Sequence, residues 1–162
     1  MRTISQELAT AYHEAGHAVV SCYYNRIPET VSIVPDGAGA VGAIDFNDVV
    51  PPEFCNYLSK DEDKMAYIEM RIVIKLAGSC AHDAIDPSRT RDGGDSYDLQ
   101  WAMEIIEECA SWAENDRVSY LEKCRKKACD IIGNNWDWIT KVTNELCSNK
   151  TLIGEEILRL RA

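Results

Sequence analysis

The stretch from residue 5 to residue 25 constrains the fold most, because it is predicted to be an amphipathic helix with two histidines on one side. The run HEAGH places His13 and His17 four residues apart, so both imidazoles project from one helix face and can reach a single metal ion. Ser5 is a suitable N-cap for this helix. Its apolar positions recur three and four residues apart: Leu8, Ala11, Tyr12, Ala15, Ala18, Val19 and Cys22.

The HEAGH run also carries a carboxylate of the kind that zinc hydrolases use as a base. Glu14 follows the first histidine, where it can take a proton from a metal-bound water without being a required ligand. The alternative is two independently packed or solvated histidines, with Glu14 on the surface. Chance is a weak explanation in a chain with only three histidines. We therefore expect one Zn²⁺, although two imidazoles and a carboxylate also suit iron, cobalt or manganese.

Catalytic zinc usually has three protein ligands, so a third donor must come from elsewhere in the chain. The extended motif HExxHxxGxxH is absent, because Val20 stands at its glycine and Tyr23 at its third histidine. Spacing alone does not choose among the remaining candidates, which are His82, Asp83, Asp86, Asp92, Asp95, Asp98 and Glu104.

The rest of the chain is predicted to be mainly helical, with one small sheet beside the first helix, in the α+β class. We expect a single domain over residues 1–162, which is an ordinary domain length. Two strands are predicted at 30–34 and 40–46, joined by Pro35-Asp36-Gly37. Helices are predicted at 61–85 and 97–113, the second capped by Asp95 or Ser96, with a surface loop at 86–95 between them. Two or three more helices are predicted to follow, punctuated by Gly133-Asn134-Asn135.

Composition excludes some classes of partner. A net charge of −10 suits neither a phosphate backbone nor an anionic lipid surface, so nucleic acid is not expected. The apolar runs fall short of the roughly 20 residues of a membrane helix, and the start of the chain lacks a leader pattern, so we expect a cytoplasmic protein with no membrane span. The seven cysteines contain no CxxC pair and are expected to be reduced core thiols.

Five blocks of the sequence together resemble the peptidase domain of the FtsH-type AAA proteases, which are membrane-anchored, ATP-dependent zinc proteases. The blocks stand in the family's order and cover nearly the whole chain: HEAGHAVV, VSIVPDGAGAVGAIDF, LAGSCAHDAI, GGDSYDLQWAMEII and LCSNKTLIGEEILRL. The resemblance implies a helical zincin-like fold. It also implies that Asp98 is the third zinc ligand. The alternative for Asp98 is a first-turn carboxylate that faces a helix N-terminus together with Asp95 or Ser96.

The chain departs from the family in several places. Nothing in this sequence resembles the family's GxxxxGK[ST] loop or its membrane anchor. We therefore expect no ATP hydrolysis of that kind by this chain. Ser79 and His82 replace an Arg and a Glu of the family pattern, and Asp36 replaces an Arg. Because of these changes, the resemblance does not extend to the polar network around the site or to the family's ring assembly. We expect His82 to be a packed histidine and not a fourth ligand.

The expected activity is that of a zinc metalloendopeptidase acting on peptides or unfolded proteins, with Glu14 as the general base. The partners implied are that substrate, a separate AAA ATPase and further copies of the chain. The 40–46 strand could present an edge to an extended substrate or merely cover the core, and both interpretations stay open. Competing hypotheses are a proteolytically silent zinc-binding module, a peptidase subunit that depends on a separate AAA unfoldase, and a hydrolase of other amides or esters.

Overall fold

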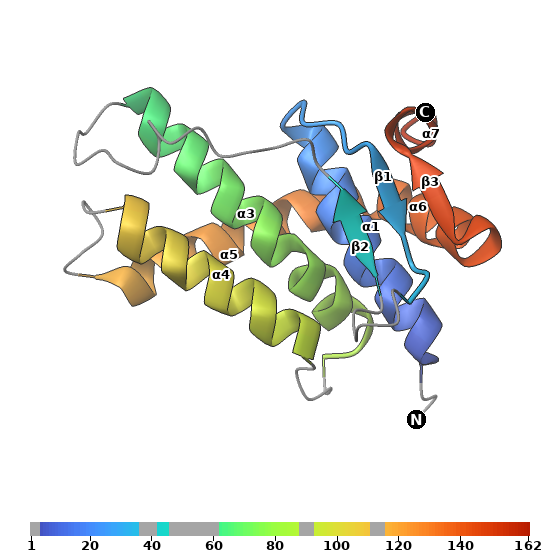
Figure 1. The fold of residues 1–162 in the computed structure, drawn as a ribbon, viewed down its shortest axis with the longest axis horizontal. Helices are drawn as coiled ribbons and strands as arrows, with labels where there is room; N and C mark the ends of the chain where they lie inside the picture. The colour runs from blue at the N-terminus through green and yellow to red at the C-terminus, as the bar shows by residue number, and fades with distance from the viewer. Residues whose placement is uncertain (1–3, 36–41, 46–61, 88–92, 111–115) are drawn as a thin grey trace.

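The computed structural model describes residues 4–35, 42–45, 62–87, 93–110 and 116–162 (Figure 1). Within these ranges six helices and three short strands are present. In chain order they are α1 (Gln6–Tyr23), β1 (Thr30–Ser32), β2 (Ala43–Asp45), α3 (Glu62–Ile85), α4 (Gly93–Cys109), α5 (Arg117–Asn134), α6 (Trp136–Asn149), β3 (Thr151–Ile153) and α7 (Gly154–Arg159). The predicted fold class, mainly helical with a small sheet, is confirmed.

Helix α1 is the central element of the fold. It begins at the predicted cap, where the Leu8 backbone N–H donates to Ser5 Oγ at 3.2 Å. It packs against α3 and α6 and also touches α5, α7 and the strands β1 and β2. Burial therefore extends beyond the predicted apolar face and includes Gly16, Val20 and Ser21. A helix that is covered on several sides needs small or apolar residues on more than one face.

The axes of α1 and α3 approach each other closely at Gly16, the glycine of the HEAGH run. A methyl group on Gly16 would lie 2.7 Å from the Ala77 carbonyl oxygen and 2.7 Å from the Ala81 Cβ. Such distances leave no room for a side chain. The glycine in the motif therefore serves the packing of these two helices.

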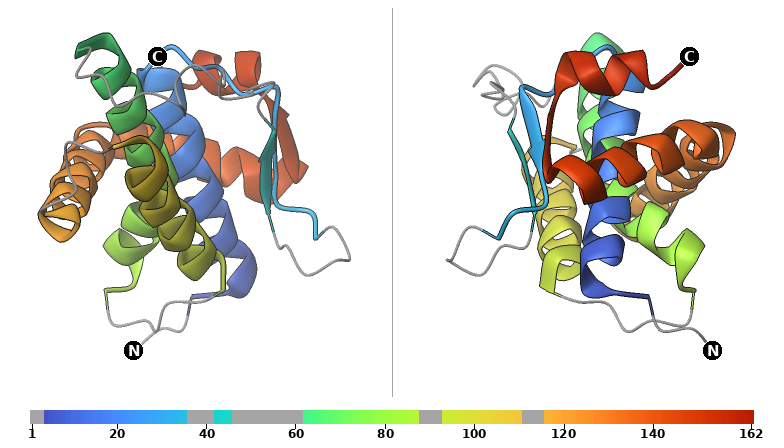
Figure 2. Two further views of the ribbon diagram at one scale, coloured as in Figure 1. Left: turned by 60° about the vertical axis from the view of Figure 1, so that its left-hand side comes forward. Right: turned by 90° about the vertical axis from the view of Figure 1, so that its right-hand side faces the viewer.

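The three strands form an antiparallel sheet in the order β2-β1-β3, which lies alongside α1 (Figure 2). The predicted pairing of the first two strands is confirmed: Val31 is opposite Ile44 in β2. Residues 36–41 and 46, which belong to the predicted turn and second strand, lie outside the described residues. Val31 is also opposite Leu152 in β3. Strand β3 was not predicted, because three residues between two helices carry too little periodicity to be recognised.

The start of α4 differs from the prediction. The helix begins at Gly93 and not after Asp95 or Ser96, so a capping role for either residue, and a loop extending to residue 95, are wrong. Glycine is a poor helix former, by about 1 kcal/mol relative to alanine in a helix interior, yet it adopts helical dihedrals without steric hindrance. Asp98 therefore stands in the second turn of α4, not the first. Helix α4 ends at Cys109 and Ala110 is no longer helical, so the predicted end near residue 113 is too late.

The C-terminal part contains three helices, in agreement with the prediction, and α5 ends at Asn134 within the predicted Gly-Asn-Asn break. The Trp138 indole N–H donates to the Ile157 carbonyl at 2.8 Å and so fastens α7 to α6. None of the helices in the described part of the chain combines the length and the apolar character that a membrane crossing requires.

Candidate metal centre

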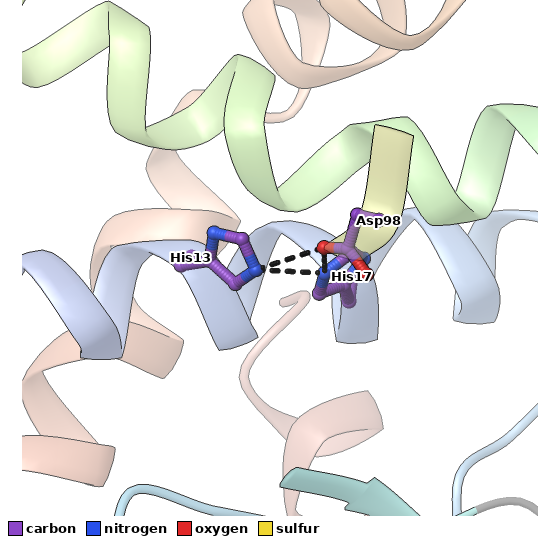
Figure 3. Close-up of side chains that lie close together, drawn as sticks. All are labelled: His13, His17 and Asp98. Carbon is purple, nitrogen blue, oxygen red and sulfur yellow. Dashed lines mark hydrogen bonds and ion pairs between the residues drawn. The ribbon is translucent and has the colours of Figure 1, made fainter. Parts of the chain in front are cut away.

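Three donor atoms from two helices converge at one point beside α1 (Figure 3). His13 Nε2 and His17 Nε2 are 3.0 Å apart. Asp98 Oδ2, which comes from α4, lies 3.1 Å from His13 Nε2 and 2.9 Å from His17 Nε2. Among the described residues, His13, His17 and Asp98 are the group whose potential metal-binding atoms all lie within 4.8 Å of one another.

Helix α3 orients the His17 ring. His17 Nδ1 lies 2.8 Å from the Ile74 carbonyl oxygen, which can only accept a hydrogen bond, so Nδ1 carries the proton. In the neutral ring, Nε2 is then an acceptor that points at Asp98 and His13. A ligating histidine is commonly held in this way by a backbone carbonyl.

This donor set fits a cation. With the His17 tautomer assigned, its Nε2 lone pair faces a carboxylate oxygen, and two acceptors in contact repel each other unless a proton or a metal ion lies between them. A tetrahedral ion with bonds of about 2.0–2.1 Å separates its ligand atoms by about 3.3 Å, only slightly more than the distances among these three atoms. Imidazole nitrogen and carboxylate oxygen are ordinary zinc ligands.

Asp98 is buried in a strongly electropositive setting. Burial by itself raises the pKa of its carboxyl group, but the positive charge that His17 carries in its protonated form, hydrogen bonds from both histidines in that form and the charge of Lys75 outweigh it and hold the pKa well below its usual range. Asp98 is therefore an anion at any physiological pH. Its other oxygen, Oδ1, accepts a hydrogen bond from Lys75 Nζ at 2.9 Å.

Glu14 is buried on α1 between the two histidines in sequence. Burial raises the pKa of its carboxyl group, and the charges of His17 and His13 partly oppose that effect. The backbone at Gly42, just before β2, passes over this side chain so closely that a Cβ there would collide with Glu14 Oε1 and would lie 2.8 Å from its Cδ. The Glu14 side chain thus lies between its own helix and the start of β2.

Gly78 on α3 covers the site from another side. A Cβ at this position would collide with His17 Nε2 and would lie 2.6 Å from His13 Nε2. Gly78 follows Ile74 by four residues and Lys75 by three, so this part of α3 supplies a carbonyl, an ammonium group and free space to the site. Sequence reasoning missed these residues, although an isolated glycine and a lysine inside the apolar run RIVIKLAGSCA are both signals of a special environment.

The other candidates for the third ligand do not join the group, as far as their side chains are described. Asp83 pairs with Arg125 at 2.7 Å, and Glu104 is exposed and accepts a hydrogen bond from Gln100. His82 is buried on α3, and it does not belong to the cluster of donor atoms. Asp92 and the Asp95 side chain lie outside the described residues, and Asp86 follows the end of α3.

Comparison with known proteins finds relatives among curated proteases but no matching family model. No family model matches the chain. An ATP-dependent zinc metalloprotease FtsH from Caldicellulosiruptor bescii is 29% identical over 195 residues, which cover 98% of this chain and 30% of that protein. The FtsH of Lachnoclostridium phytofermentans is 29% identical, with 93% of this chain and 29% of that protein covered. These matches confirm the resemblance inferred from the sequence blocks.

A eukaryotic relative shows the same relation. The mitochondrial inner membrane m-AAA protease component YTA10 of Saccharomyces cerevisiae is 24% identical over 193 residues, which cover 98% of this chain and 24% of that protein. The chain therefore spans less than a third of the length of each of these three relatives.

Proposed function

We propose that this chain, which is similar to FtsH-type zinc metalloproteases over nearly its whole length, is a zinc metallopeptidase that hydrolyses peptide bonds in peptides or unfolded proteins. In this proposal His13, His17 and Asp98 hold Zn²⁺, and Glu14 is the general base. The observation that carries the proposal is the convergence of three potential metal-binding atoms from α1 and α4, on the partly buried His13 and the buried His17 and Asp98, close to the buried carboxylate of Glu14.

A zinc ion bound there would supply a Lewis acid that acidifies a water molecule and polarises a peptide carbonyl. Glu14 takes up a proton at its carboxylate and returns it to the leaving amine. Burial suits this role because it raises the pKa of Glu14 and so strengthens the base, while nearby positive charge partly opposes that effect. The hydrogen bond from His17 Nδ1 to the Ile74 carbonyl keeps the ring in its ligating orientation.

We further propose that an extended substrate adds to the free edge of β2. In the sheet order β2-β1-β3, this strand has a neighbour on one side only within the described residues. The residue before it, Gly42, lies directly against Glu14. A peptide that paired with this edge would therefore run close to the proposed base.

The names of the two FtsH relatives include ATP dependence, and an ATPase on another chain or elsewhere in a longer polypeptide would supply unfolded substrate to this site. A folded protein rarely offers an extended strand to an enclosed centre. An unfolded substrate such as casein is therefore the appropriate first probe.

The experiment measures zinc content and casein cleavage for the wild-type chain and for Glu14→Gln and Asp98→Ala. We expect one zinc per wild-type chain, zinc without cleavage in Glu14→Gln, with a rate about 10²–10⁴-fold lower, and loss of zinc in Asp98→Ala. Glu7→Gln is the matched control, because Glu7 is an exposed carboxylate on the same helix that pairs with Lys150.

The outcomes separate the competing functions. Zinc without cleavage in the wild type would favour a silent zinc-binding module, and cleavage that appears only when an AAA ATPase and ATP are added would favour a dependent subunit. A wild-type chain that binds no metal would refute the proposal altogether.

A further inference from the structure

The two oxygens of Asp98 have different partners. Oδ2 faces the Nε2 atoms of His13 and His17, at 3.1 and 2.9 Å. Oδ1 faces the other way and accepts a hydrogen bond from Lys75 Nζ at 2.9 Å. The carboxylate thus offers one oxygen to the candidate metal centre, while the ammonium group of Lys75 occupies the second.

Lys75 is held in this position by more than its charge. Its Nζ lies 5.3 Å from the centroid of the Tyr97 ring and 5.5 Å from that of Trp101. Both aromatic residues belong to α4 and are four residues apart, so they lie on one face of that helix, next to Asp98. A cation over aromatic faces is attracted by the ring quadrupole. Three groups of α4 therefore fix one ammonium group that comes from α3.

This ion pair is not an ordinary surface salt bridge. The side chains of Lys75 and Asp98 are 30% and 6% exposed, whereas those of Lys123 and Glu69 are 64% and 16% exposed. A pair that is partly shielded from water is electrostatically stronger and geometrically better defined than a more exposed one. The Lys75 contact can therefore control the orientation of the Asp98 carboxylate.

We infer that Lys75 is a positioning residue for the metal centre, one that holds Oδ1 of Asp98 so that this carboxylate can offer a metal ion Oδ2 alone. The inference rests on the proposed function, since it requires a metal at His13, His17 and Asp98. When Oδ1 is released, a carboxylate can bind a metal through both oxygens, which raises the coordination number and occupies a position that a catalytic centre leaves to water or substrate.

The test replaces zinc with Co²⁺, whose visible absorption weakens as the coordination number rises from four to five or six. The protein is titrated with Co²⁺ at fixed pH, for the wild type, Lys75→Met and Lys75→Arg. Lys75→Met removes both the hydrogen bond and the charge, whereas Lys75→Arg keeps both. Lys123→Met is the matched control, because it removes a lysine from an exposed ion pair between α5 and α3.

We expect the molar absorptivity of the bound Co²⁺ to fall at least about twofold in Lys75→Met, and to stay close to wild type in Lys75→Arg and Lys123→Met. Binding of Co²⁺ to Lys75→Met should not weaken for reasons of charge, because the substitution removes a positive charge near the ion. Complete loss of Co²⁺ from a folded Lys75→Met protein would also support the role, since Asp98 would then no longer be presented to the metal.

A Lys75→Met protein that is folded by circular dichroism and has the wild-type Co²⁺ spectrum would overturn the inference. If Lys75→Met does not fold, Lys75→Arg decides: a wild-type spectrum supports the role and an altered one contradicts it. A wild-type chain that takes up no Co²⁺ or Zn²⁺ would instead refute the proposed function, so the two failures are distinguishable.

Discussion

Gly78 decides how much space the candidate metal centre has. Its missing side chain leaves room for the Nε2 atoms of His13 and His17, which a Cβ would contact. Those atoms are the outer ends of movable side chains, so the rings can turn aside when a methyl group appears. A substitution here is therefore expected to affect metal binding far more than folding.

Gly78→Ala is predicted to weaken Zn²⁺ binding at least about 10-fold, because turned rings no longer present their Nε2 atoms to one ion. The free energy of unfolding of the metal-free protein should change by less than about 1 kcal/mol, because the higher helix propensity of alanine, worth about that amount, offsets the cost of turning the two rings aside. Calorimetric zinc titration and urea unfolding measure the two effects. Zinc affinity equal to that of the wild type would contradict the close contact between Gly78 and the two rings.

Helix packing places α1 and α3, two of the three helices that surround the site. Helix α1 brings the histidines, α3 orients one of them through the Ile74 carbonyl, and both depend on the close approach at Gly16. Unlike Gly78, Gly16 faces a backbone carbonyl, that of Ala77, which cannot turn aside. The same substitution should therefore have opposite consequences at the two glycines.

Gly16→Ala is predicted to destabilise the metal-free protein by about 1–3 kcal/mol, as is usual for overpacked cores. Gly133→Ala is the control, because a Cβ there meets no atom within 4 Å. It should be neutral or should stabilise α5 by up to about 1 kcal/mol. Urea unfolding followed by circular dichroism compares the two variants, and equal stability would mean that α1 and α3 are further apart than the structure shows.

Cysteine chemistry reports on the packing of α3 against α5. Cys80 Sγ and Cys129 Sγ are 2.8 Å apart, with Cys80 buried and Cys129 exposed, so the expectation of core thiols does not hold for Cys129. The hydrogen bond between the two sulfurs, together with the charge of Arg125, lowers the pKa of Cys129 against the effect of its partial desolvation, while the same bond and burial raise the pKa of Cys80. The thiolate that forms near neutral pH is therefore that of Cys129.

Diamide, which accepts the two hydrogens of a thiol pair, is predicted to form the Cys80–Cys129 disulfide, and faster as the pH rises and Cys129 ionises. Mass spectrometry would detect a link between the tryptic peptides 76–89 and 128–141, each of which contains one cysteine. Cys129→Ser should abolish that product and Cys147→Ser should leave it. A different dominant pair would argue against the α3–α5 contact.

At the scale of the whole molecule, a metal ion would join segments that are far apart in the chain. His17 and Asp98 are 81 residues apart, and the unfolded chain cannot hold them together without a large loss of entropy. A ligand that binds the folded state alone stabilises it by mass action, by about 2.7 kcal/mol at 100 times its dissociation constant. Zinc should therefore raise the melting temperature.

We predict that the increase in melting temperature caused by zinc is reversed by a chelator and shrinks between about pH 7.5 and about pH 5.5, because an imidazole must lose its proton to ligate. Thermal unfolding with and without zinc, at both pH values, measures this. The Asp98→Ala variant should gain little from zinc at either pH. An equal gain in that variant would place the metal elsewhere.

Local sequence pattern determined the parts of this protein that depend on neighbouring residues. The periodicity of α1, the Ser5 cap, the paired histidines and the glycine-asparagine break after α5 all follow from contacts within a few residues. The predicted start of α4 was wrong, because glycine can adopt helical dihedrals although it is a poor helix former. Strand β3 was missed because it is too short to show a periodic pattern.

The tertiary structure alone decided which distant groups meet. From the residues themselves, seven acids and histidines were equal candidates to join His13 and His17, and the blocks that resemble FtsH-type proteases implied Asp98. Packing brings Asp98 to the histidines, and no other candidate whose side chain is described. Packing also turned Lys75 and Gly78 of α3 toward the same point, because neighbours across three helices are set by shape and burial, which no local spacing encodes.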